Sequence, residues 1–298
     1  GRCYWLKVYE IPDGEKQGKG RAIQNLMQLP QDDKIRAIID VKNLQDEEFV
    51  NSHYIVLCTK QGIIKKTDLA DFSRPRANGV NAITIVEGDQ LLNAKMTDGN
   101  SEIMLAVKSG RAIRFPEAKV RSTGRGAIGV SGIEVDDATD EVVGMICVNV
   151  EDKTRTVLVV SEKGYGKRTA VDEYRVTNRG GKGVKTISVT EKTGKLVGIL
   201  DVTEKEDLMI TCVSGITIRT SIAQISEQGR ATQGVKLIRL DDEDEIAAIT
   251  NLDVVIEQPE AEGIENIVAE ASTDAPATNE STPESPENNQ GPEEKTEN

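Results

Sequence analysis

The chain has 298 residues and a formal net charge of −13, from 37 lysine and arginine residues against 50 aspartate and glutamate residues. No run of apolar residues approaches the length of about 18 that a membrane-spanning helix needs, so we expect no membrane span. His53 is the only histidine, which nearly excludes histidine-containing catalytic triads and metal sites built from several histidines.

The four cysteines, Cys3, Cys58, Cys147 and Cys212, stand singly in apolar runs without Cys-x-x-Cys spacing. This pattern predicts buried, reduced thiols rather than a disulfide framework or a metal site. Reduced thiols favour the cytosol.

A unit recurs along the chain, and its clearest marker is a Gly-Val pair. The pairs begin at Gly79, Gly129, Gly183 and Gly234, so they are spaced by 50, 54 and 51 residues. Each unit has a glycine turn, a strand with basic residues, a polar basic connection and then the Gly-Val pair that opens another strand. Repeats of this length are typical of propellers and solenoids, in which one unit cannot bury its own apolar face.

In chain order, the first unit is a loose copy that begins at Gly1 without a leading strand, so we expect it to be truncated and the chain to be part of a longer protein. The third unit is the most explicit. Its apolar runs 102–108 and 112–115 predict a hairpin, and the runs 129–135 and 141–148 predict two further strands. We therefore predict one four-stranded sheet per unit and no helix of ten or more residues.

The predicted fold is an all-β, propeller-like domain over residues 1–253, in which five repeated four-stranded blades are visible and the first is truncated. The approximate blade boundaries are 1–48, 49–98, 99–150, 151–203 and 204–253. Residues 254–298 carry a net charge of −11 and almost no apolar content. That composition predicts a disordered acidic tail.

Positive charge follows the phase of the repeat. Windows from two residues before each turn glycine to two residues after the glycine of the Gly-Val pair, together with the opening window 1–22, are all net positive, between +2 and +5. The acidic residues concentrate in other turns. Isolated lysines on outer strands often only protect an edge, but that explanation predicts scattered charges of both signs. Five positive windows, rich in arginine and glycine, instead indicate a band that binds phosphates.

Aromatic residues make up only 3% of the chain, which disfavours a protein that stacks single-stranded bases. Duplex DNA, contacted mainly through its backbone, is the better ligand, and many contacts would offset the cost of bending it. The predicted DNA-binding residues are Arg2, Lys7, Lys19, Arg21, Lys65, Lys66, Arg74, Arg76, Arg111, Arg114, Arg121, Arg125, Lys167, Arg168, Arg175, Arg179, Lys182, Lys185, Arg219, Arg230 and Lys236.

Two glycine-rich motifs are better explained by turns than by nucleotide binding. The stretch 124–129 matches Gly-x-Gly-x-x-Gly, but a strand follows it where a dinucleotide site requires a helix. The stretch 164–169 lacks the first glycine of a phosphate-binding loop and has Arg168 in place of the Ser or Thr that holds magnesium. We predict no catalytic residue, cofactor site or metal site in this chain.

Four stretches resemble the C-terminal domain of the DNA gyrase A subunit: Gly1-Arg-Cys-Tyr-Trp-Leu-Lys-Val-Tyr-Glu-Ile-Pro12, Lys19-Gly-Arg-Ala-Ile, Gly164-Tyr-Gly-Lys-Arg-Thr-Ala-Val-Asp-Glu-Tyr174 and Thr232-Gln-Gly-Val-Lys-Leu-Ile-Arg239. The resemblance covers about residues 1–253. It implies a six-bladed β-pinwheel whose basic rim wraps duplex DNA. In this family, gyrase is a bacterial type IIA topoisomerase that uses such wrapping and ATP to introduce negative supercoils. The resemblance therefore also implies a bacterial, nucleoid-associated location.

Two departures from the family pattern limit what the resemblance implies. The family's Gln-basic-Arg-Gly-Gly-basic-Gly box belongs to its first blade, upstream of Gly1; Asn178-Arg-Gly-Gly-Lys-Gly183 is similar but lies in a later unit. The family's catalytic tyrosine and its ATPase subunit lie outside this chain, so the chain's own tyrosines, Tyr4, Tyr9, Tyr54, Tyr165 and Tyr174, inherit no catalytic role. ATP and Mg would be used by the rest of the holoenzyme.

The expected partners are duplex DNA, the remainder of gyrase A and the gyrase B subunit in an A2B2 complex. The acidic tail is expected to compete with DNA for the basic rim. Two alternatives stay open: the related DNA-binding C-terminal domain of topoisomerase IV, and a propeller-like scaffold whose basic strip binds an acidic protein.

Overall fold

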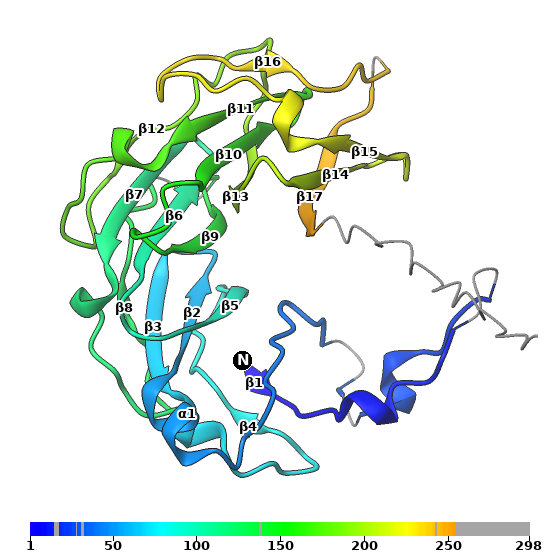
Figure 1. The fold of residues 1–298 in the computed structure, drawn as a ribbon, viewed down its shortest axis with the longest axis vertical. Helices are drawn as coiled ribbons and strands as arrows, with labels where there is room; N and C mark the ends of the chain where they lie inside the picture. Colours follow the sequence, from blue (N-terminus) through cyan, green and yellow to red (C-terminus); the bar gives the residue numbers. More distant parts are fainter. Residues whose placement is uncertain (15–17, 28, 31–32, 137–138, 242, 254–298) are drawn as a thin grey trace, which may run out of the picture. The chain divides into compact units, whose positions relative to one another are not determined.

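The computed structural model describes residues 1–14, 18–27, 29–30, 33–136, 139–241 and 243–253. Within these ranges the regular structure is almost entirely β, with one short α-helix and six turns of 3-10 helix (Figure 1). No helix in this part of the chain is long and apolar enough to cross a membrane. The predicted acidic tail, residues 254–298, lies outside the described residues.

The four later units share one order of elements: a hairpin of two longer strands, a turn of 3-10 helix, a strand of two residues and a long strand. The second unit has β2 (Tyr54–Thr59), β3 (Ile63–Asp68), η3 (Leu69–Phe72), β4 (Val80–Asn81) and β5 (Leu91–Thr97). The third has β6 (Glu102–Val107), β7 (Arg111–Pro116), η4 (Glu117–Lys119), β8 (Val130–Ser131) and β9 (Val142–Val148).

The fourth unit has β10 (Thr156–Ser161), β11 (Tyr165–Ala170), η5 (Val171–Glu173), β12 (Val184–Lys185) and β13 (Leu196–Val202). The fifth has β14 (Glu206–Cys212), β15 (Thr217–Ser221), η6 (Ile222–Gln224), β16 (Val235–Lys236) and β17 (Ile246–Asp253). The first unit contributes β1 (Arg2–Cys3), η1 (Val8–Glu10) and η2 (Ile23–Asn25), and α1 (Glu47–Ser52) precedes β2.

Each four-stranded sheet borrows one strand from the next unit. The strand orders are β5-β2-β3-β8, β12-β7-β6-β9 and β13-β10-β11-β16. In these sheets Val130 pairs with Ile64, Val184 pairs with Ala112, and Val235 pairs with Gly166. The borrowed strand gives hydrogen-bond partners to the outer edge of each hairpin, which would otherwise be open.

The prediction of four-stranded sheets is therefore confirmed, but the prediction that all four strands come from one unit is wrong. The predicted strand 129–135 is reduced to the two residues of β8, which pair with β3 of the preceding unit. The predicted hairpin is confirmed as β6 and β7. At the two ends, the described residues form smaller sheets, β1-β4 and β15-β14-β17.

The central strands of the four-stranded sheets are apolar on both faces because each of these sheets lies between two hydrophobic clusters. In β6, Ile103 and Leu105 belong to a cluster shared with β2 and β3, while Met104 and Ala106 belong to a cluster shared with β10 and β13. The same alternation occurs in β10, where Leu158 packs towards β14. Alternate residues of a strand point to opposite faces, so the continuous apolar runs in the sequence reflect sheets covered on both sides.

The four cysteines form no disulfide among the described residues. Cys58 and Cys212 are buried, whereas Cys3 and Cys147 are only partly buried, so the prediction of buried thiols holds fully for two of the four. Burial raises the pKa of the Cys147 thiol to about 12 and that of Cys3 to about 11, which keeps both protonated near neutral pH.

The glycine of each Gly-Val pair has a backbone conformation that other residues rarely adopt. Gly129, Gly183 and Gly234 have φ values of 107°, 73° and 79°. A Cβ atom on Gly183 would lie 2.5 Å from the carbonyl oxygen of Ala112 in the preceding unit. Glycine is therefore required twice, by the positive φ and by the close approach of two backbones.

We predict that Gly183→Ala lowers the free energy of unfolding by at least about 1–2 kcal/mol, the cost of placing a residue with a Cβ in this region, and by more if the preceding strand must shift. Gly126→Ala is the matched control, because a Cβ there meets no atom within 4 Å. Urea unfolding of both variants measures the difference. Equal stabilities for the two variants would contradict the packing described here.

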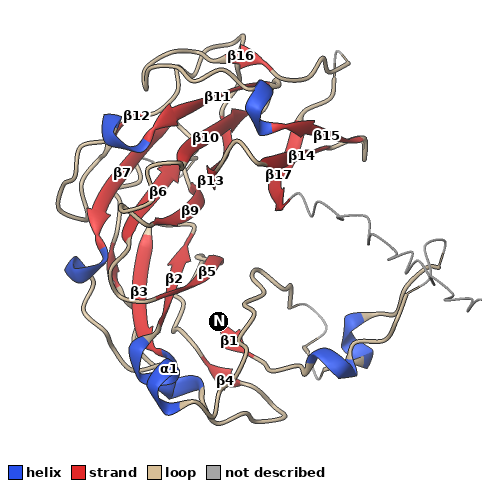
Figure 2. Cartoon of the chain, viewed as in Figure 1, coloured by secondary structure: helices blue, strands red, loops and turns tan. Residues whose placement is uncertain are grey.

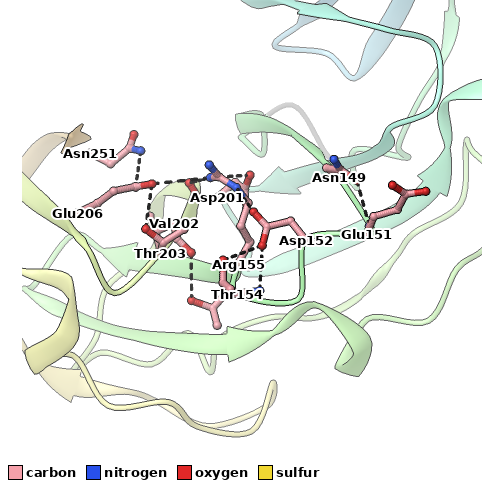
Figure 3. Close-up of polar contacts among 11 residues, drawn as sticks. Asn149, Glu151, Asp152, Thr154, Arg155, Asp201, Val202, Thr203, Glu206 and Asn251 are labelled. Carbon is pink, nitrogen blue, oxygen red and sulfur yellow. Dashed lines mark hydrogen bonds and ion pairs between the residues drawn. The ribbon is translucent and has the colours of Figure 1, made fainter. Parts of the chain in front are cut away.

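A polar network joins the fourth and fifth units (Figure 3). Arg155, just before β10, lies between three carboxylates: its Nη1 is 3.1 Å from Asp201 Oδ2 and 3.8 Å from Glu206 Oε1, and its Nε is 3.3 Å from Asp152 Oδ2. Asn251 on β17 donates a hydrogen bond of 2.7 Å to Glu206. The network therefore ties β10, β13, β14 and β17 together.

Burial raises the pKa of Asp201 above its ordinary value, although Arg155 acts in the opposite direction. A raised pKa means that the folded protein holds this proton more tightly than the unfolded chain. The contribution of Asp201 to stability is therefore full at low pH and is lost as the pH rises through the folded pKa.

We accordingly predict that Asp201→Asn gains stability relative to the parent chain as the pH rises from about 4 to 7, since only the parent chain titrates at this position. Urea unfolding at several pH values measures this difference. If the parent chain instead gained stability relative to Asp201→Asn over this range, the pKa of Asp201 would be lowered by folding rather than raised.

Candidate nucleic-acid interface

Four loops carry much of the predicted basic band, and we call them the connecting loops. They join each turn of 3-10 helix to the following two-residue strand and span residues 73–79, 120–129, 174–183 and 225–234. Figure 2 shows three of them as parts of the tan segments that lead into β4, β12 and β16, and Figure 1 labels β8, into which the fourth leads. Because the units repeat, the connecting loops occupy equivalent places on successive sheets.

Three of the connecting loops lie along the outer hairpin strand of the preceding unit. Their backbone N–H groups donate to that strand at matching positions: Thr123 to Lys66, Thr177 to Arg114 and Gln228 to Arg168, at 2.8–2.9 Å. The register is the same each time, since these donors all lie six residues before the glycine of a Gly-Val pair. The loops therefore form one series along the edge that carries β3, β7 and β11 (Figure 1).

The shared register brings loop arginines to repeated positions. Arg125, Arg179 and Arg230 lie four residues before the glycine, and Arg121 and Arg175 lie eight residues before it. Arg121 and Arg175 are exposed, while the other three are half-buried. The loops 120–129 and 174–183, in successive units, thus carry arginines at the same two positions of the repeat.

Five residues of the predicted DNA-binding set are buried instead and face the protein. Lys65 and Lys167 are 1% and 0% exposed, and the other three are 5–7% exposed. They occupy the middle of outer hairpin strands, which the next connecting loop covers. The five are Lys65, Lys66, Arg114, Lys167 and Arg168. Their charged groups have partners within the protein and do not face a ligand.

Lys65 and Lys167 end in cages of backbone carbonyl groups. The Lys65 ammonium donates to the carbonyl oxygens of Ala82 and Arg125, both at 2.7 Å. The Lys167 ammonium donates to those of Gly229 and Arg230 at 2.5 and 2.6 Å. Removal from water lowers the pKa of each lysine from 10.5 to about 8.

The other three buried cations lie one position after the Lys65 and Lys167 position of the outer strand. They contact the following unit through backbone carbonyl oxygens or carboxylates. Arg114 donates to the carbonyl oxygens of Val171 and Tyr174 at 2.7 and 2.9 Å and also pairs with Glu102. Arg168 donates to Ile225 at 2.7 Å and to the carboxylate of Glu204 at 3.0 Å.

Lys66 lies 3.4 Å from the fully buried carboxylate of Glu117 and over the ring of Tyr54. Buried charges with such partners hold units together, whereas an unpaired one would be costly. Each of the three cations reaches across to the unit that follows its own.

The remaining sixteen predicted residues are at least partly accessible. Arg111, Arg125, Arg179 and Arg230 are half-buried. The exposed ones are Arg2, Lys7, Lys19, Arg21, Arg74, Arg76, Arg121, Arg175, Lys182, Lys185, Arg219 and Lys236. Those that lie on the connecting loops or on the two-residue strands form the repeated band; Lys7, Lys19 and Arg21 lie in the first unit, outside the repeated geometry.

Some accessible cations already have acidic partners. Asp136 lies between Arg111 and Lys182, with nitrogen-to-oxygen distances of 2.9 and 3.2 Å, and Lys182 is also 3.6 Å from Glu134. Arg219 is 2.6 Å from Asp207. Exposed ion pairs are weak and exchange readily, so phosphates can compete for these cations.

Lys119 is an exposed cation that was not predicted from the sequence. It ends η4 directly before the connecting loop 120–129, and its carbonyl oxygen accepts a hydrogen bond from Arg179 Nε at 3.1 Å. The available signal was its position two residues before Arg121, inside a window that is already strongly positive. It lies beside the band and extends it.

The two rejected glycine motifs lie in turns and strands, as predicted from the sequence. Residues 124–129 belong to a connecting loop that leads into β8, and residues 164–169 begin at a hairpin turn and continue into β11. Neither stretch leads into a helix that could face a phosphate group. Within the described part of the chain, no three His, Cys, Asp or Glu side chains gather in a way that could hold a metal ion.

Comparison with known proteins gives a consistent result. A family model described as "DNA gyrase C-terminal domain, beta-propeller" matches residues 1–42, 53–98, 101–149, 155–203 and 206–253. The DNA gyrase A protein of Staphylococcus aureus strain NCTC 8325 is 41% identical over 276 residues, which is 92% of this chain and 30% of that protein. The protein of strain MRSA252 is 40% identical over 252 residues. The chain thus spans about 30% of the length of these relatives.

Two solved structures have a similar fold. A DNA gyrase A C-terminal domain superposes with a TM-score of 0.71 at 27% identity, covering 84% of this chain and 79% of that one. The C-terminal domain of DNA topoisomerase IV superposes with a TM-score of 0.75 at 20% identity, covering 85% and 76%. At that lower identity the second likeness concerns the fold alone.

The two lowered lysine pKa values predict a pH dependence of stability. Between about pH 8 and 10.5 the unfolded chain binds more protons at Lys65 and Lys167 than the folded protein does, so these lysines add stability as the pH rises. A Lys65→Met, Lys167→Met variant lacks this gain. Urea unfolding at pH 7 and 9.5 should show the parent chain gaining relative to the variant, and a difference independent of pH would contradict the assignment.

Proposed function

The chain belongs to the family of DNA gyrase C-terminal domains, and from this premise we propose that its connecting loops bind duplex DNA and bend it along the edge that they form. The observation that carries the proposal is the repetition of accessible arginines at equal loop positions, Arg121 and Arg175 above all. A ligand that runs past successive units must present the same chemistry at intervals. The phosphate backbone of a duplex does so.

The composition of the band supports backbone contacts rather than base reading. Its cations lie on loops and on two-residue strands, and it has no helix of a length that would fill a major groove among the described residues. Bending a site of 20–30 base pairs by 40–90° costs about 1–6 kcal/mol, which must be offset by many contacts spread along the curve. A series of equivalent loops supplies contacts of that kind.

For the whole protein we propose the role implied by the family. This chain would be the DNA-binding part of gyrase A, in an A2B2 topoisomerase complex that uses ATP to introduce negative supercoils. The domain would perform no chemistry itself, and the catalytic tyrosine and the ATPase would lie elsewhere in the complex. The 41% identity to gyrase A favours this role over that of topoisomerase IV, whose similarity to the chain is one of fold.

The test is duplex DNA binding across a salt series, with a variant in which Arg76, Arg121, Arg175 and Lys236 are changed to Gln. We expect log affinity to fall linearly with log salt concentration. The slope of the variant should be shallower by up to about 3.6, which is about 0.9 for each phosphate that the variant no longer neutralises. Fluorescence resonance energy transfer between the two ends of the duplex reports the bend.

The matched control changes four other exposed lysines, Lys42, Lys153, Lys195 and Lys205, to Gln. It removes the same formal charge from places outside the band, so the slope and the bend should both stay close to those of the parent chain. If the control weakened binding as much as the loop variant, the binding would depend on net charge alone. If the folded parent chain did not bind duplex DNA at all, the proposed function would be wrong.

A further inference from the structure

Lys65 and Lys167 occupy the same position of the repeat, and this inference, which rests on the proposed function, concerns what they do there. Each lies one residue after the position at which the outer hairpin strand pairs with the borrowed strand: Ile64 with Val130, and Gly166 with Val235. Both side chains are buried, at 1% and 0% exposure. Neither ammonium group can reach DNA without unfolding its surroundings.

Each of these ammonium groups has a partner on the connecting loop of the next unit, although Lys65 also donates to Ala82 of its own unit. Lys65 holds the carbonyl oxygen of Arg125 at 2.7 Å, and Lys167 holds that of Arg230 at 2.6 Å. Arg125 and Arg230 are themselves equivalent, since each lies four residues before a Gly-Val glycine. In both cases, therefore, a buried lysine donates a hydrogen bond to the backbone carbonyl of a loop arginine. The guanidinium group of that arginine is itself partly accessible.

The third equivalent position provides an internal comparison. Unit three has Ile113 where the other two have lysine, so the loop 174–183 has no buried ammonium beneath it. There the side chain of Arg179 itself holds the loop in place. Its Nε donates to the carbonyl oxygen of Lys119 at 3.1 Å, and its Nη1 donates to that of Ser131 at 3.0 Å. Where the lysine is present, the side chain of the loop arginine makes fewer hydrogen bonds. Arg230 makes one, from Nη1 to the carbonyl oxygen of Lys185, and Arg125 makes none with the described residues.

We propose that Lys65 and Lys167 are positioning residues for DNA binding, which fix the backbone at Arg125 and Arg230 so that these two guanidinium groups face the phosphate backbone. The ammonium supplies donors that the loop carbonyls would otherwise lack, and the loop is ordered before the ligand arrives. Ordering a loop in advance lowers the entropic cost of binding. The buried lysines thus act on DNA through the arginines above them.

A double-mutant cycle on DNA affinity tests the inference. Arg125→Gln should weaken binding about three- to tenfold and make the salt slope shallower by about 0.9. Lys65→Met should produce a similar loss, although its own charge never contacts phosphate. If Lys65 acts through Arg125, the double variant loses no more than the larger of the two single losses. Losses that multiply would overturn the proposal, because they would mean that the two residues act independently.

Lys163→Met is the matched control, because it removes the same charge from an exposed turn of the fourth unit. It should leave both the affinity and the slope close to those of the parent chain. The pair Lys167→Met and Arg230→Gln repeats the cycle two units later. If a methionine variant does not fold, as judged by thermal unfolding, Lys65→Gln and Lys167→Gln replace it, since an amide still donates to one carbonyl group.

The outcomes separate this inference from the proposed function. A folded parent chain that fails to bind duplex DNA refutes both. A parent chain that binds with a steep salt dependence, together with independent effects of Lys65 and Arg125, refutes only the positioning role. Coupled effects in both lysine–arginine pairs, with an unaffected Lys163→Met control, support it.

Discussion

The exchange of a two-residue strand between neighbouring units is the interaction on which the rest of this structure depends. The outer strand of a hairpin has an edge of unpaired N–H and C=O groups, and the following unit fills it with β8, β12 or β16. The exchange brings two backbones so close that only glycine fits before the borrowed strand. It also fixes where each connecting loop must run, because the loop leads directly into that strand.

The same exchange explains why positive charge has two separate uses in this chain. A cation in the middle of an outer strand is covered by the next loop and must find partners inside, as Lys167 and Arg168 do. A cation on the loop itself stays accessible, as Arg121 and Arg175 do. Since a buried charge without partners is costly, the carbonyl groups of the loop and the cations beneath it stabilise each other.

These relations connect local structure to the proposed DNA binding. The loops keep one register along successive sheets, so accessible arginines recur without any need for a separate binding element. The hydrophobic clusters between the sheets keep the units in a fixed succession, because residues such as Leu105 and Leu158 are buried against neighbouring sheets. A repeated surface of this kind suits a repetitive ligand, whose many weak contacts add along its length.

Much of the fold followed from the sequence by itself. The spacing of the Gly-Val pairs determined the repeat, the short apolar runs determined the strands, and the resemblance of four stretches determined the family. For the candidate site, the sequence determined which phase of the repeat is basic. These features are local, or they depend on periodicity, so they can be read along one chain.

Only the tertiary structure decided which partner each strand and each cation takes. Nothing in the stretch 129–135 indicates that Val130 pairs with the preceding unit, because a two-residue strand has no periodicity of its own. Likewise, Lys65 and Arg121 both lie in positively charged windows of the sequence. In the structure, the loop of a neighbouring unit buries Lys65, whereas Arg121 is exposed to solvent. Burial depends on segments about 60 residues apart, such as Lys65 and Arg125, and that pairing arises only when the units pack together.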